Sequence, residues 1–492
     1  MTDSISGRLR AAIAGHARAG RLAIDGPEPV TYAELGRRID RSAAGVHAWG
    51  VTRGDKVGLV AGKSAVAIAA YFGAMQAGAC VCFVDPGLAP AAFAEQAQTV
   101  GMRHLLVDAN HAERFAQAAS PDLSLRPLED LAIEGAYGDD RLGREDDAML
   151  LFTSGSTGRP KGVLLRHGAL ICNAEGVLHH TGTGPEDRLL HVMPLYHTNG
   201  VNNQLIAPFL AGASVILLDR FKPETAIEAL RRDRPTYMTG VPTIFARMLP
   251  HLTESERFPA LRFLRCGSAP ITPTLHRQIE DAFGVPLVVS YGLSEATCTS
   301  TMNPPGNRRI GTIGTVLAGQ TVRLFDPVTN AEAAEGSEGE IRISGPVLMA
   351  GYIGSSEQPI IDGWLRTGDL GRFDADGFLA ITGRIKDVII RGGENISPAL
   401  IERHLVTHPA VHDCCVVGAP HADLGEIPVA FVVLKSDVEV DAADLKTFVG
   451  QKLARIYIPS EIFILPTLPT NSFGKTDRKT LREILRENNV PL

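Results

Sequence analysis

Apolar runs of strand length alternate with helical patterns through most of this chain, and this alternation limits the possible folds more than any other feature. Examples of the apolar runs are Lys56–Ala61, Leu105–Asp108, Ser214–Asp219 and Pro286–Ser290. Parallel strands need a crossover connection, usually a helix, and burial on both faces gives them unbroken apolar runs. We therefore expect an α/β fold with largely parallel sheets.

The pattern changes twice, and the changes predict how the chain is divided. With 492 residues the chain is too long for one hydrophobic core, because cores stop growing near about 250–300 residues. From about Gly311 the strands become shorter and the turns tighter, with a hairpin turn predicted at 374–377. A second α/β pattern begins after Arg384. We expect a large N-terminal domain of stacked α/β sheets with a small β-rich lobe, residues 1–384, and a small α+β C-terminal domain, residues 385–492.

Net charge and cysteine usage limit the partners and the compartment. A formal net charge of −7 gives no electrostatic attraction to nucleic acid or to an anionic membrane. The segment Met1–Gly15 lacks the pattern of a signal peptide, and Ala65–Val84 reads as a buried helix followed by a strand rather than as a membrane span. The seven cysteines form no CxxC pair, which is typical of reduced thiols. We expect a cytoplasmic protein.

A run of small and hydroxyl residues, Thr153–Gly162, directly follows the apolar run Ala148–Phe152. Small residues let backbone N–H groups close around phosphate oxygens, while hydroxyl groups add donors or help to hold a metal ion. A flexible linker has a similar composition, but it needs neither the Pro-Lys-Gly ending nor an apolar run on each side. We therefore predict a phosphate-binding loop in which Lys161 supplies a point charge. Its candidate residues are Thr153, Ser154, Gly155, Ser156, Thr157, Gly158 and Lys161.

Two other nucleotide-binding motifs are missing from the sequence. A Walker loop needs a glycine five residues before Gly-Lys-Ser/Thr, and the two candidates, at 62–64 and 474–476, have Val57 and Pro469 there. The Gly-Thr-Gly stretch at 182–184 lacks the third glycine of a Rossmann fingerprint. These spacings exclude a P-loop ATPase and disfavour a Rossmann dehydrogenase.

The Thr153–Gly162 loop resembles the signature of the acyl-adenylate-forming (AMP-binding) superfamily, which includes acyl-CoA synthetases, adenylation domains of non-ribosomal peptide synthesis and firefly-type luciferases. The other motifs of that superfamily occur in order across nearly the whole chain, and the resemblance is greatest to the acyl-CoA synthetases. The segment 291–295, Tyr-Gly-Leu-Ser-Glu, is similar to the Tyr-Gly-x-Ser/Thr-Glu element of the superfamily.

The resemblance assigns the nucleotide-binding roles. It implies that Tyr291, beside Gly292, lies against adenine and that Ser294 contacts the α-phosphate. It further implies that Glu295 holds Mg²⁺ with Thr157, and a hard carboxylate oxygen is a ligand type that Mg²⁺ prefers.

Two further elements are similar to nucleotide-contacting parts of the family. The residues Gly267, Ser268 and Ala269 resemble the loop that borders adenine and the acyl group, although an ordinary turn would explain them equally well. The stretch that ends in Asp369 resembles the element whose aspartate accepts hydrogen bonds from the ribose hydroxyls, with a generic turn aspartate as the alternative. The resemblance gives Arg384 as a second ribose contact.

The C-terminal motifs resemble the mobile half of the family's enzymes. The resemblance places the hinge at Lys386 and implies that the C-terminal domain is mobile. Gly392 and Gly393 resemble the loop that forms part of the pantetheine channel of coenzyme A, and a plain turn before a capped helix is compatible with that role. Lys475 resembles the catalytic lysine that bridges the attacking carboxylate and the α-phosphate. Its loop departs from the family pattern at Thr470 and Phe473, which leaves the contacts of that loop open.

The stretch 193–200 resembles the segment that gates the acid pocket. There His197 contacts the carboxylate or swings aside to admit the thiol, unless it is a structural histidine, and Asn199 is either a specificity contact or a satisfied loop amide. The candidate pocket segments contain no Arg or Lys, which disfavours dicarboxylates unless side chains enter from elsewhere. The predicted acid-pocket residues are His197, Asn199, Gly200, Val241, Leu293 and Thr297.

The resemblance implies a two-step reaction. A carboxylic acid and MgATP give an acyl-adenylate and pyrophosphate, and coenzyme A then takes the acyl group and releases AMP. The alternatives are an enzyme that loads a carrier-protein pantetheine, a luciferase-like oxidation, and a non-catalytic ATP or AMP sensor. No attached carrier domain follows in the sequence, which favours coenzyme A. The identity of the acid and the oligomeric state stay open.

Overall fold

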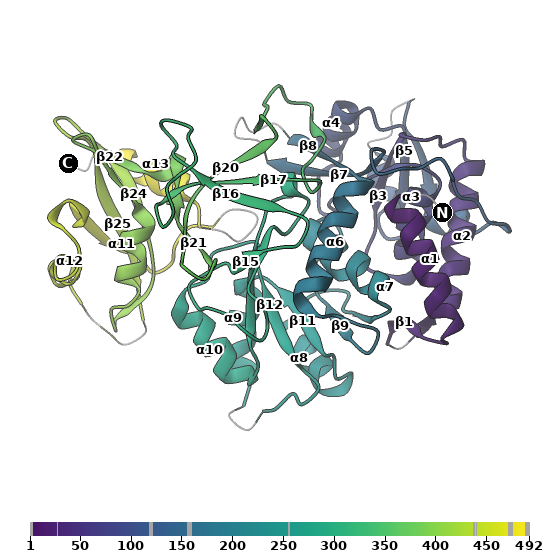
Figure 1. The fold of residues 1–492 in the computed structure, drawn as a ribbon, viewed down its shortest axis with the longest axis horizontal. Helices are drawn as coiled ribbons and strands as arrows, with labels where there is room; N and C mark the ends of the chain where they lie inside the picture. Colours follow the sequence, from purple (N-terminus) through teal and green to yellow (C-terminus); the bar gives the residue numbers. More distant parts are fainter. Residues whose placement is uncertain are drawn as a thin grey trace. The chain divides into compact units, whose positions relative to one another are not determined.

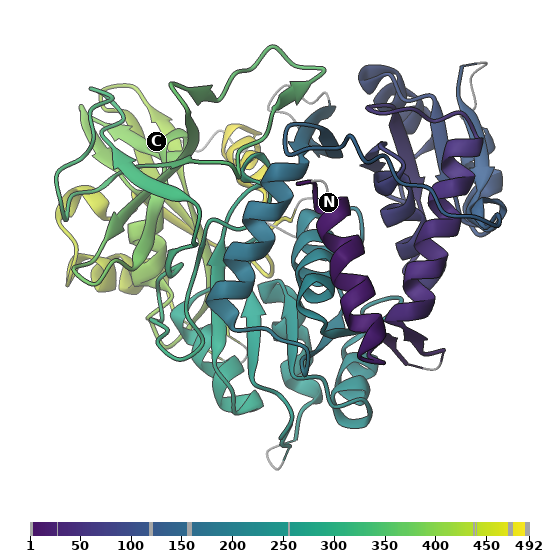
Figure 2. The same ribbon diagram turned by 45° about the vertical axis from the view of Figure 1, so that its right-hand side comes forward.

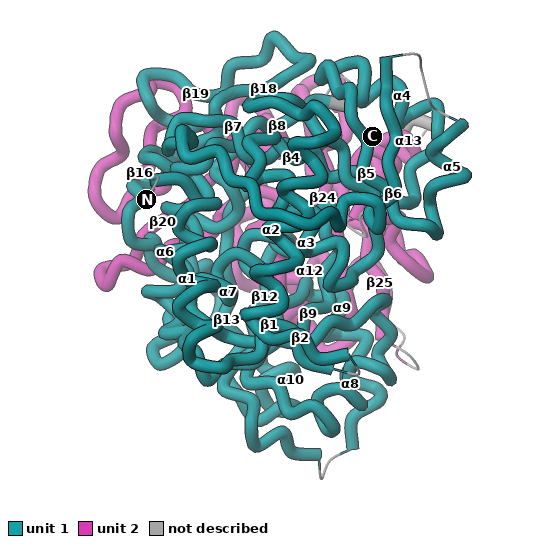
Figure 3. The backbone as a smooth tube through the Cα atoms, turned by 90° about the vertical axis from the view of Figure 1, so that its right-hand side faces the viewer, with its two compact units in different colours: residues 1–268, 276–322, 343–365 teal, residues 269–275, 323–342, 366–492 magenta. Residues whose placement is uncertain are grey.

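The computed structural model describes residues 3–26, 28–117, 122–154, 160–253, 256–435, 438, 440–470 and 476–487. The chain divides into two compact units (Figure 3). Unit 1 comprises residues 1–268, 276–322 and 343–365, and unit 2 comprises residues 269–275, 323–342 and 366–492. The predicted α/β architecture with a separate C-terminal part is confirmed.

The first sheet of unit 1 has nine strands in the order β15-β14-β13-β12-β11-β9-β10-β1-β2. Its centre is parallel, from β13 to β1, and the edge strands β14, β15 and β2 are antiparallel to their neighbours. The strands are β1 (Leu22–Asp25), β2 (Val30–Thr31), β9 (Arg188–His191), β10 (Ser214–Leu217), β11 (Tyr237–Gly240), β12 (Phe263–Cys266), β13 (Leu287–Tyr291), β14 (Thr301–Met302) and β15 (Thr315–Val316).

The second sheet of unit 1 has seven strands in the order β18-β8-β7-β4-β3-β5-β6. They are β3 (Lys56–Val60), β4 (Cys80–Phe83), β5 (His104–Val107), β6 (Ser124–Pro127), β7 (Asp147–Ser154), β8 (Pro160–Arg166) and β18 (Gly351–Ile353). Strands β7 and β8 pair antiparallel as far as Ser154 opposite Pro160. The middle of the predicted phosphate loop, residues 155–159, lies outside the described residues, and it joins the paired ends of these two strands.

Helices cover both sheets. Figures 1 and 2 show α6 (His167–Thr181) in the middle of unit 1, with α1 (Ile5–Arg18) beside it. The helix α3 (Ala65–Gln76) is buried over nearly its whole length and is followed by β4, so the expectation of a buried helix and a strand at 65–84 is confirmed. Among the described helices, none combines the length and apolar character that crossing a bilayer requires.

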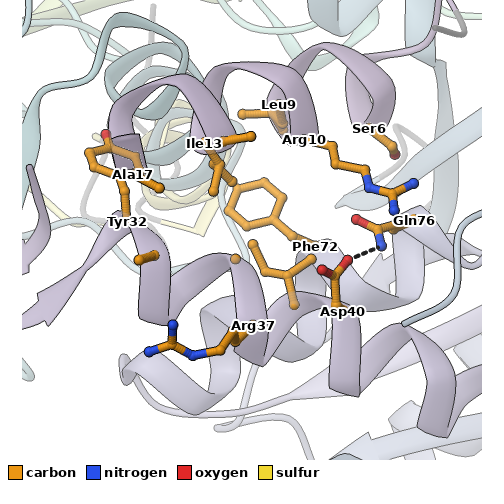
Figure 4. A pocket seen from close by; sticks show the side chains of 14 residues that line it. Ser6, Leu9, Arg10, Ile13, Ala17, Tyr32, Arg37, Asp40, Phe72 and Gln76 are labelled. Carbon is orange, nitrogen blue, oxygen red and sulfur yellow. Dashed lines mark hydrogen bonds between the residues drawn. The ribbon is translucent and has the colours of Figure 1, made fainter. Parts of the chain in front are cut away.

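A cavity of about 230 Å³ opens between α1, α2 (Tyr32–Ala48) and α3 (Figure 4). Apolar side chains such as Leu9, Ile13 and Phe72 form much of its wall. At one end Gln76 donates a hydrogen bond of 2.8 Å to Asp40. None of the predicted site residues lines this cavity.

Unit 2 holds two groups of strands. The first contains most of β16 (Thr321–Phe325), β17 (Gly339–Ser344) and β20 (Trp364–Phe373), and all of β21 (Leu379–Arg384). The predicted hairpin turn at 374–377 is confirmed, because β20 and β21 pair antiparallel around it and the Gly377 N–H donates to the Asp374 carbonyl at 3.1 Å.

The second group is the C-terminal α+β segment. The hairpin β24 (Val411–His421) and β25 (Gly425–Leu434) carries β26 (Glu461–Ile464) in parallel on β25. The remaining elements are β22 (Ile389–Arg391), β23 (Glu394–Ile396), α11 (Pro398–Leu405), α12 (Ala442–Gly450) and α13 (Arg478–Glu487). Two apolar clusters form its core, one with α11 and α12 and one with α13.

Two buried histidines of unit 1 make its stability depend on pH. His167, the first residue of α6, is fully buried, and burial lowers its pKa to about 4. His191, the last residue of β9, lies with Nε2 2.8 Å from the Gly200 carbonyl oxygen, and burial with the nearby charge of Lys63 lowers its pKa to about 3. Below pH 6.5 these two histidines bind protons in the unfolded chain but not in the folded chain. The free energy of unfolding therefore decreases as the pH decreases.

We expect the free energy of unfolding to fall by about 2 kcal/mol for each of these histidines between pH 6.5 and pH 5, because one pKa unit corresponds to about 1.36 kcal/mol. In urea titrations at a series of pH values, the free energy of unfolding of the variant His167→Gln should depend less steeply on pH than that of the wild type. His412→Gln is the matched control, because His412 is exposed. An unchanged slope in His167→Gln would contradict a buried neutral imidazole.

Candidate active site

The predicted adenine-binding residues of unit 1 lie where neighbouring parallel strands end. Tyr291 is the last residue of β13, while Gly267 and Ser268 follow β12, and these two strands pair with Cys266 opposite Val289. The carboxyl ends of parallel strands share one edge of a sheet, where open α/β sheets bind ligands. The predicted residue Val241 follows β11 at the same edge.

Close backbone packing explains two glycines at this edge. A Cβ atom on Gly267 would lie 2.8 Å from Ser290 Oγ, and one on Gly292 would lie 2.0 Å from the Cys298 carbonyl oxygen. Any larger residue would therefore push Gly267 away from Ser290, or Gly292 away from Cys298. The third residue of the predicted adenine loop, Ala269, falls in unit 2.

Glu295 lies in a short 3₁₀ helix, Ser294–Ala296, and is fixed by strand β18 and the residues before it. Tyr352 of β18 donates a hydrogen bond of 2.6 Å to Glu295 Oε1, and the Met349 N–H donates to the Glu295 backbone carbonyl at 2.8 Å. Burial and the Glu295 carboxylate raise the pKa of Tyr352, so the phenol stays protonated and keeps donating. Glu295 Oε2 accepts no hydrogen bond from the described residues.

Tyr352 also contacts the lysine of the predicted phosphate loop. Lys161 Nζ lies 3.9 Å from the centre of the Tyr352 ring and 2.6 Å from Glu357 Oε2. One aromatic side chain thus lies between the candidate phosphate-binding cation and the candidate metal-binding carboxylate. The sequence analysis missed both Tyr352 and Glu357. The antiparallel pairing of β18 with β8, with Tyr352 opposite Val163, brings them to the loop.

The rest of the phosphate loop is only partly covered by the structure. The backbone of Thr153 and Ser154 forms the end of β7, and their side chains are not described. The predicted residues Gly155, Ser156, Thr157 and Gly158 lie outside the described residues.

The predicted acid-pocket residues centre on a π-helix, η2 (Asn199–Ile206), a form that often marks functional sites. The amides of Asn199 and Asn203 are 3.0 Å apart, and Asn202 donates a hydrogen bond of 3.0 Å to the Thr297 carbonyl. Thr297 is buried with a φ of +66°, and its hydroxyl donates to the Val347 carbonyl at 2.6 Å. The helix therefore fixes the chain that follows Glu295.

Two other predicted pocket residues lie at the start of this helix, and a third lies near Glu295. The ring of His197 is partly exposed and lies 4.7 Å from that of Tyr196. A Cβ atom on Gly200 would lie 2.0 Å from the Pro194 carbonyl oxygen, so this position requires glycine. Leu293 is partly exposed and directly precedes the 3₁₀ helix.

In unit 2 the two predicted ribose contacts are neighbours across β20 and β21. Asp369 lies opposite Arg384, and the Arg384 Nε donates a hydrogen bond of 2.5 Å to Asp369 Oδ1. Asp369 is only 4% exposed, whereas Arg384 is exposed. The strand pairing thus holds the buried carboxylate beside the exposed guanidinium.

The predicted hinge and pantetheine residues lie beyond β21. Lys386 is exposed in a short 3₁₀ helix, and the next residue, Asp387, lies 3.7 Å from Arg478 and 3.4 Å from Arg482 of α13. Gly392 and Gly393 form the turn of the β22–β23 hairpin with φ values of +56° and +87°. Two successive positive φ values are what a type I′ hairpin turn requires.

The predicted catalytic lysine, Lys475, lies outside the described residues. The residues on either side of its loop are paired, because Thr470 forms a β-bridge with Thr476 and the Asp477 N–H donates to the Pro469 carbonyl at 2.8 Å. These contacts give the loop a closed base, and α13 begins directly after it.

Two family models match the chain. The model of AMP-binding enzymes matches residues 10–353, and the model of the AMP-binding enzyme C-terminal domain matches residues 400–475. A feruloyl-CoA synthase from Amycolatopsis is 34% identical over 473 residues, which cover 95% of each chain. A sulfoacetate–CoA ligase from Cupriavidus necator is 39% identical over 342 residues, which cover 68% of this chain and 66% of that one.

Solved structures give the same picture. ATP-bound MatB from Rhodopseudomonas palustris superimposes with a TM-score of 0.89 at 30% identity, covering 97% of this chain and 99% of that chain. The o-succinylbenzoate CoA synthetase MenE from Bacillus subtilis, solved with its acyl-adenylate intermediate, gives a TM-score of 0.83 at 27% identity, covering 96% and 97%.

Proposed function

The chain belongs to the AMP-binding enzyme family, and we infer that it is an ATP-dependent acid–CoA ligase, which forms acyl-CoA, AMP and pyrophosphate through an acyl-adenylate. The observation that carries this assignment is the match of both family domains in order, together with similarity to a CoA synthase over 95% of the chain. The strand-end positions of Tyr291 and Gly267 support it, because a nucleotide would bind at that edge.

The reaction consists of two nucleophilic displacements, the first at phosphorus and the second at carbon. In the first, a carboxylate oxygen attacks the α-phosphorus of ATP, the new P–O bond forms, and pyrophosphate leaves with the electrons of the broken P–O bond. In the second, the thiolate sulfur of CoA attacks the acyl carbon, and AMP leaves. Because two anions meet in the first step, catalysis depends on positioning and on neutralising charge.

We propose the following roles for the residues of unit 1. Tyr291, Gly292, Gly267 and Ser268 border the adenine, and Ser294 contacts the α-phosphate. The loop 153–161 holds the pyrophosphate part of ATP, with Lys161 moving from Glu357 to the phosphates, because a phosphate carries more charge than one carboxylate. His197, Asn199, Gly200, Val241, Leu293 and Thr297 form the acid pocket.

We propose Mg²⁺ as the metal of this site. The described residues contain no cluster of three or more His, Cys, Asp or Glu side chains that could hold a metal. Mg²⁺ commonly binds one or two carboxylates together with substrate phosphates and water, so the single carboxylate of Glu295, with Oε2 open, fits that ion. Thr157 is the second proposed protein ligand. When bound, the metal supplies positive charge at the phosphates.

The remaining roles belong to the C-terminal half of the chain. Asp369 and Arg384 hold the ribose, and Ala269 completes the adenine loop. We propose a domain boundary between residues 384 and 385, with Lys386 as the hinge. Gly392 and Gly393 admit the pantetheine arm in the second step, and Lys475 bridges the carboxylate and the α-phosphate in the first.

Acid-dependent exchange of ³²P between pyrophosphate and ATP tests the assignment. We expect exchange with at least one member of a broad panel of carboxylic acids and consumption of the product adenylate when CoA is added. The absence of exchange across the panel would contradict the assignment. Free CoA and a holo-carrier protein should then be compared as acceptors. Transfer to the carrier alone would favour the alternative, a stand-alone adenylation enzyme, and ATP binding without turnover would favour a sensor.

Replacing Asp369 by Asn should raise the KM for ATP by about 10- to 100-fold, because hydrogen bonds to a charged acceptor contribute about 1.5–3 kcal/mol. The pyrophosphate-exchange assay measures this at a saturating acid concentration. Asp376→Asn, in the exposed turn of the same hairpin, is the matched control and should leave KM unchanged. An equal effect of both substitutions would contradict the ribose contact.

We also propose a reducing, cytoplasmic location. All seven cysteines are described, and none forms a disulfide. Six of the seven are buried, which is typical of thiols that serve as small apolar side chains.

A further inference from the structure

Arg265 on β12 is a buried arginine of unit 1 that the sequence analysis did not select. It is 3% exposed, and its Nε donates to Ser290 Oγ at 3.3 Å, while its Nη2 donates to Thr299 Oγ1 at 2.6 Å. One end of the Asn203 amide lies 3.3 and 3.1 Å from Nη1 and Nη2, and it must be the oxygen, because a guanidinium only donates. All three partners are neutral.

In the part of the chain that the structure describes, no carboxylate lies within ion-pair distance of Arg265. The acidic groups that act on its charge are a thiol and a phenol, those of Cys298 and Tyr237, and burial outweighs them and lowers the pKa of Arg265 to about 10. By contrast, the buried Arg342 of unit 2 pairs with Glu340 at 2.7 Å. A buried charge without an opposite charge costs several kcal/mol, so an arginine in this setting calls for an anion from outside the chain.

The position of Arg265 determines where such an anion would lie. Arg265 precedes Gly267 by two residues, and Gly267 packs so closely against Ser290 that a Cβ atom there would lie 2.8 Å from Ser290 Oγ. Ser290 is partly exposed although Arg265 beneath it is not. The Asn203 amide that accepts from Arg265 also lies 3.0 Å from the amide of Asn199 in the predicted acid pocket. Asn203 thus lies between the arginine and the pocket residue Asn199 and contacts both.

The donor inventory leaves room for one more partner. A guanidinium has five N–H groups, and the contacts to Ser290, Thr299 and Asn203 use four of them. One N–H of Nη1 is left over. The Ser290 hydroxyl now donates a long hydrogen bond of 3.4 Å to the Cys266 carbonyl, and it could turn from that carbonyl to a ligand. A carboxylate or sulfonate group could then accept from this hydroxyl or from the remaining N–H of Nη1, and such charge-assisted hydrogen bonds are the strong ones.

The reacting carboxylate itself is a poor partner for this arginine. That carboxylate loses its charge when it becomes the mixed anhydride, so an arginine paired with it would be left without a counter-ion during the reaction. A second anionic group keeps its charge through both steps. We propose that the acid activated by this enzyme carries a second anionic group, a carboxylate or sulfonate, which is bound beside Ser290 and balanced by Arg265. This inference rests on the proposed ligase function and specifies its substrate class.

Pyrophosphate release with matched pairs of acids tests the proposal. The panel contains oxalate, malonate, succinate, glutarate and sulfoacetate, each compared with an analogue whose distal anionic group is replaced by a neutral amide. It also contains aliphatic and aromatic monocarboxylates. We expect the best dianionic acid to exceed its neutral analogue in kcat/KM by about 10- to 100-fold, as one hydrogen-bonded charge pair implies. Equal or greater kcat/KM for the neutral analogues would overturn the proposal.

Variants separate a specificity role from a structural one. Arg265→Met should remove the preference for the dianionic acid, and Arg265→Lys, which keeps the charge, should retain part of it. Arg277→Gln, on an exposed face of α10 (Pro273–Phe283), is the matched control and should keep the preference. An equal fall for charged and neutral acids in both Arg265 variants would make the residue structural and overturn the proposal.

The ligase activity and the preference for a second anionic group are tested by different results. If no acid releases pyrophosphate, the ligase assignment fails. If monocarboxylates release it as well as dianionic acids do, the assignment stands and the second-anion proposal falls. If Arg265→Met does not fold, the wild-type ratio between each acid and its neutral analogue decides the question alone.

Discussion

Replacing Lys475 by Ala should lower acid-dependent ATP–pyrophosphate exchange by at least about 10²–10³-fold, while transfer of the acyl group from supplied acyl-adenylate to CoA stays near the wild-type rate. The reason is electrostatic, because a carboxylate and a phosphate of like charge must approach in the first step and a lysine between them offsets the repulsion. The second step joins a thiolate to a mixed anhydride that has already lost the carboxylate charge, so it does not need this lysine.

The two half-reactions should be measured separately, by pyrophosphate exchange and by CoA-dependent release of AMP from acyl-adenylate. Lys479→Ala is a matched control on α13, because the Lys479 side chain is exposed and lies 3.7 Å from Glu483 one turn away. It should leave both half-reactions unchanged. A similar loss in both half-reactions of Lys475→Ala would contradict the division of labour between the two steps.

Replacing Glu295 by Gln should lower adenylation by about 10²-fold and raise the Mg²⁺ concentration needed for half the maximal rate. The amide has nearly the same shape but no negative charge, and a neutral oxygen is a weaker ligand for a hard cation. A 10²-fold loss corresponds to about 2.7 kcal/mol of transition-state stabilisation. The measurement is the rate of pyrophosphate release as a function of Mg²⁺ at fixed ATP.

Tyr352→Phe is the matched control for this variant, because it removes the hydrogen bond to Glu295 Oε1 and keeps the carboxylate. We expect Tyr352→Phe to lower the adenylation rate by about tenfold or less, because it removes one hydrogen bond, and to shift the Mg²⁺ requirement less than Glu295→Gln does. If Glu295→Gln and Tyr352→Phe lost activity equally, the carboxylate would act by holding β18 in place and not by binding the metal.

The sequence predicted the parts of this structure that depend on local pattern. Runs such as Pro286–Ser290 alternate with helices and become parallel strands, and the motif that begins at Tyr291 lies at a strand end because it directly follows such a run. Pattern also identified the buried helix at 65–76.

The contacts that the sequence did not predict depend on distant pairing. Tyr352 reaches Glu295 and Lys161 because β18 adds to the edge of a sheet whose neighbouring strand lies about 190 residues earlier, and no local pattern encodes that register. Arg265 lies in the middle of the short strand β12. Side chains alternate between the two faces of a sheet, and the sequence of so short a strand does not show which face Arg265 occupies. Its burial follows from the polar cluster supplied by η2 and the residues around Thr299. The expectation of a pocket without cations was drawn from loop segments alone and did not consider Arg265, which lies on a strand and contacts Asn203 beside Asn199.

The ion pairs of Asp387 bear on how the C-terminal segment transmits motion. Asp387 directly follows the proposed hinge residue Lys386 and binds Arg478 and Arg482, and Arg478 also binds the partly buried Glu402 at 2.8 Å. The helix α13 that follows the Lys475 loop is thereby braced against the first residue beyond the pivot. A change in the backbone angles at Lys386 would therefore move α13 together with Asp387, because these ion pairs join them. If the proposed rotation at Lys386 withdraws Lys475, the same rotation would also determine when the thiol reaches the acyl-adenylate.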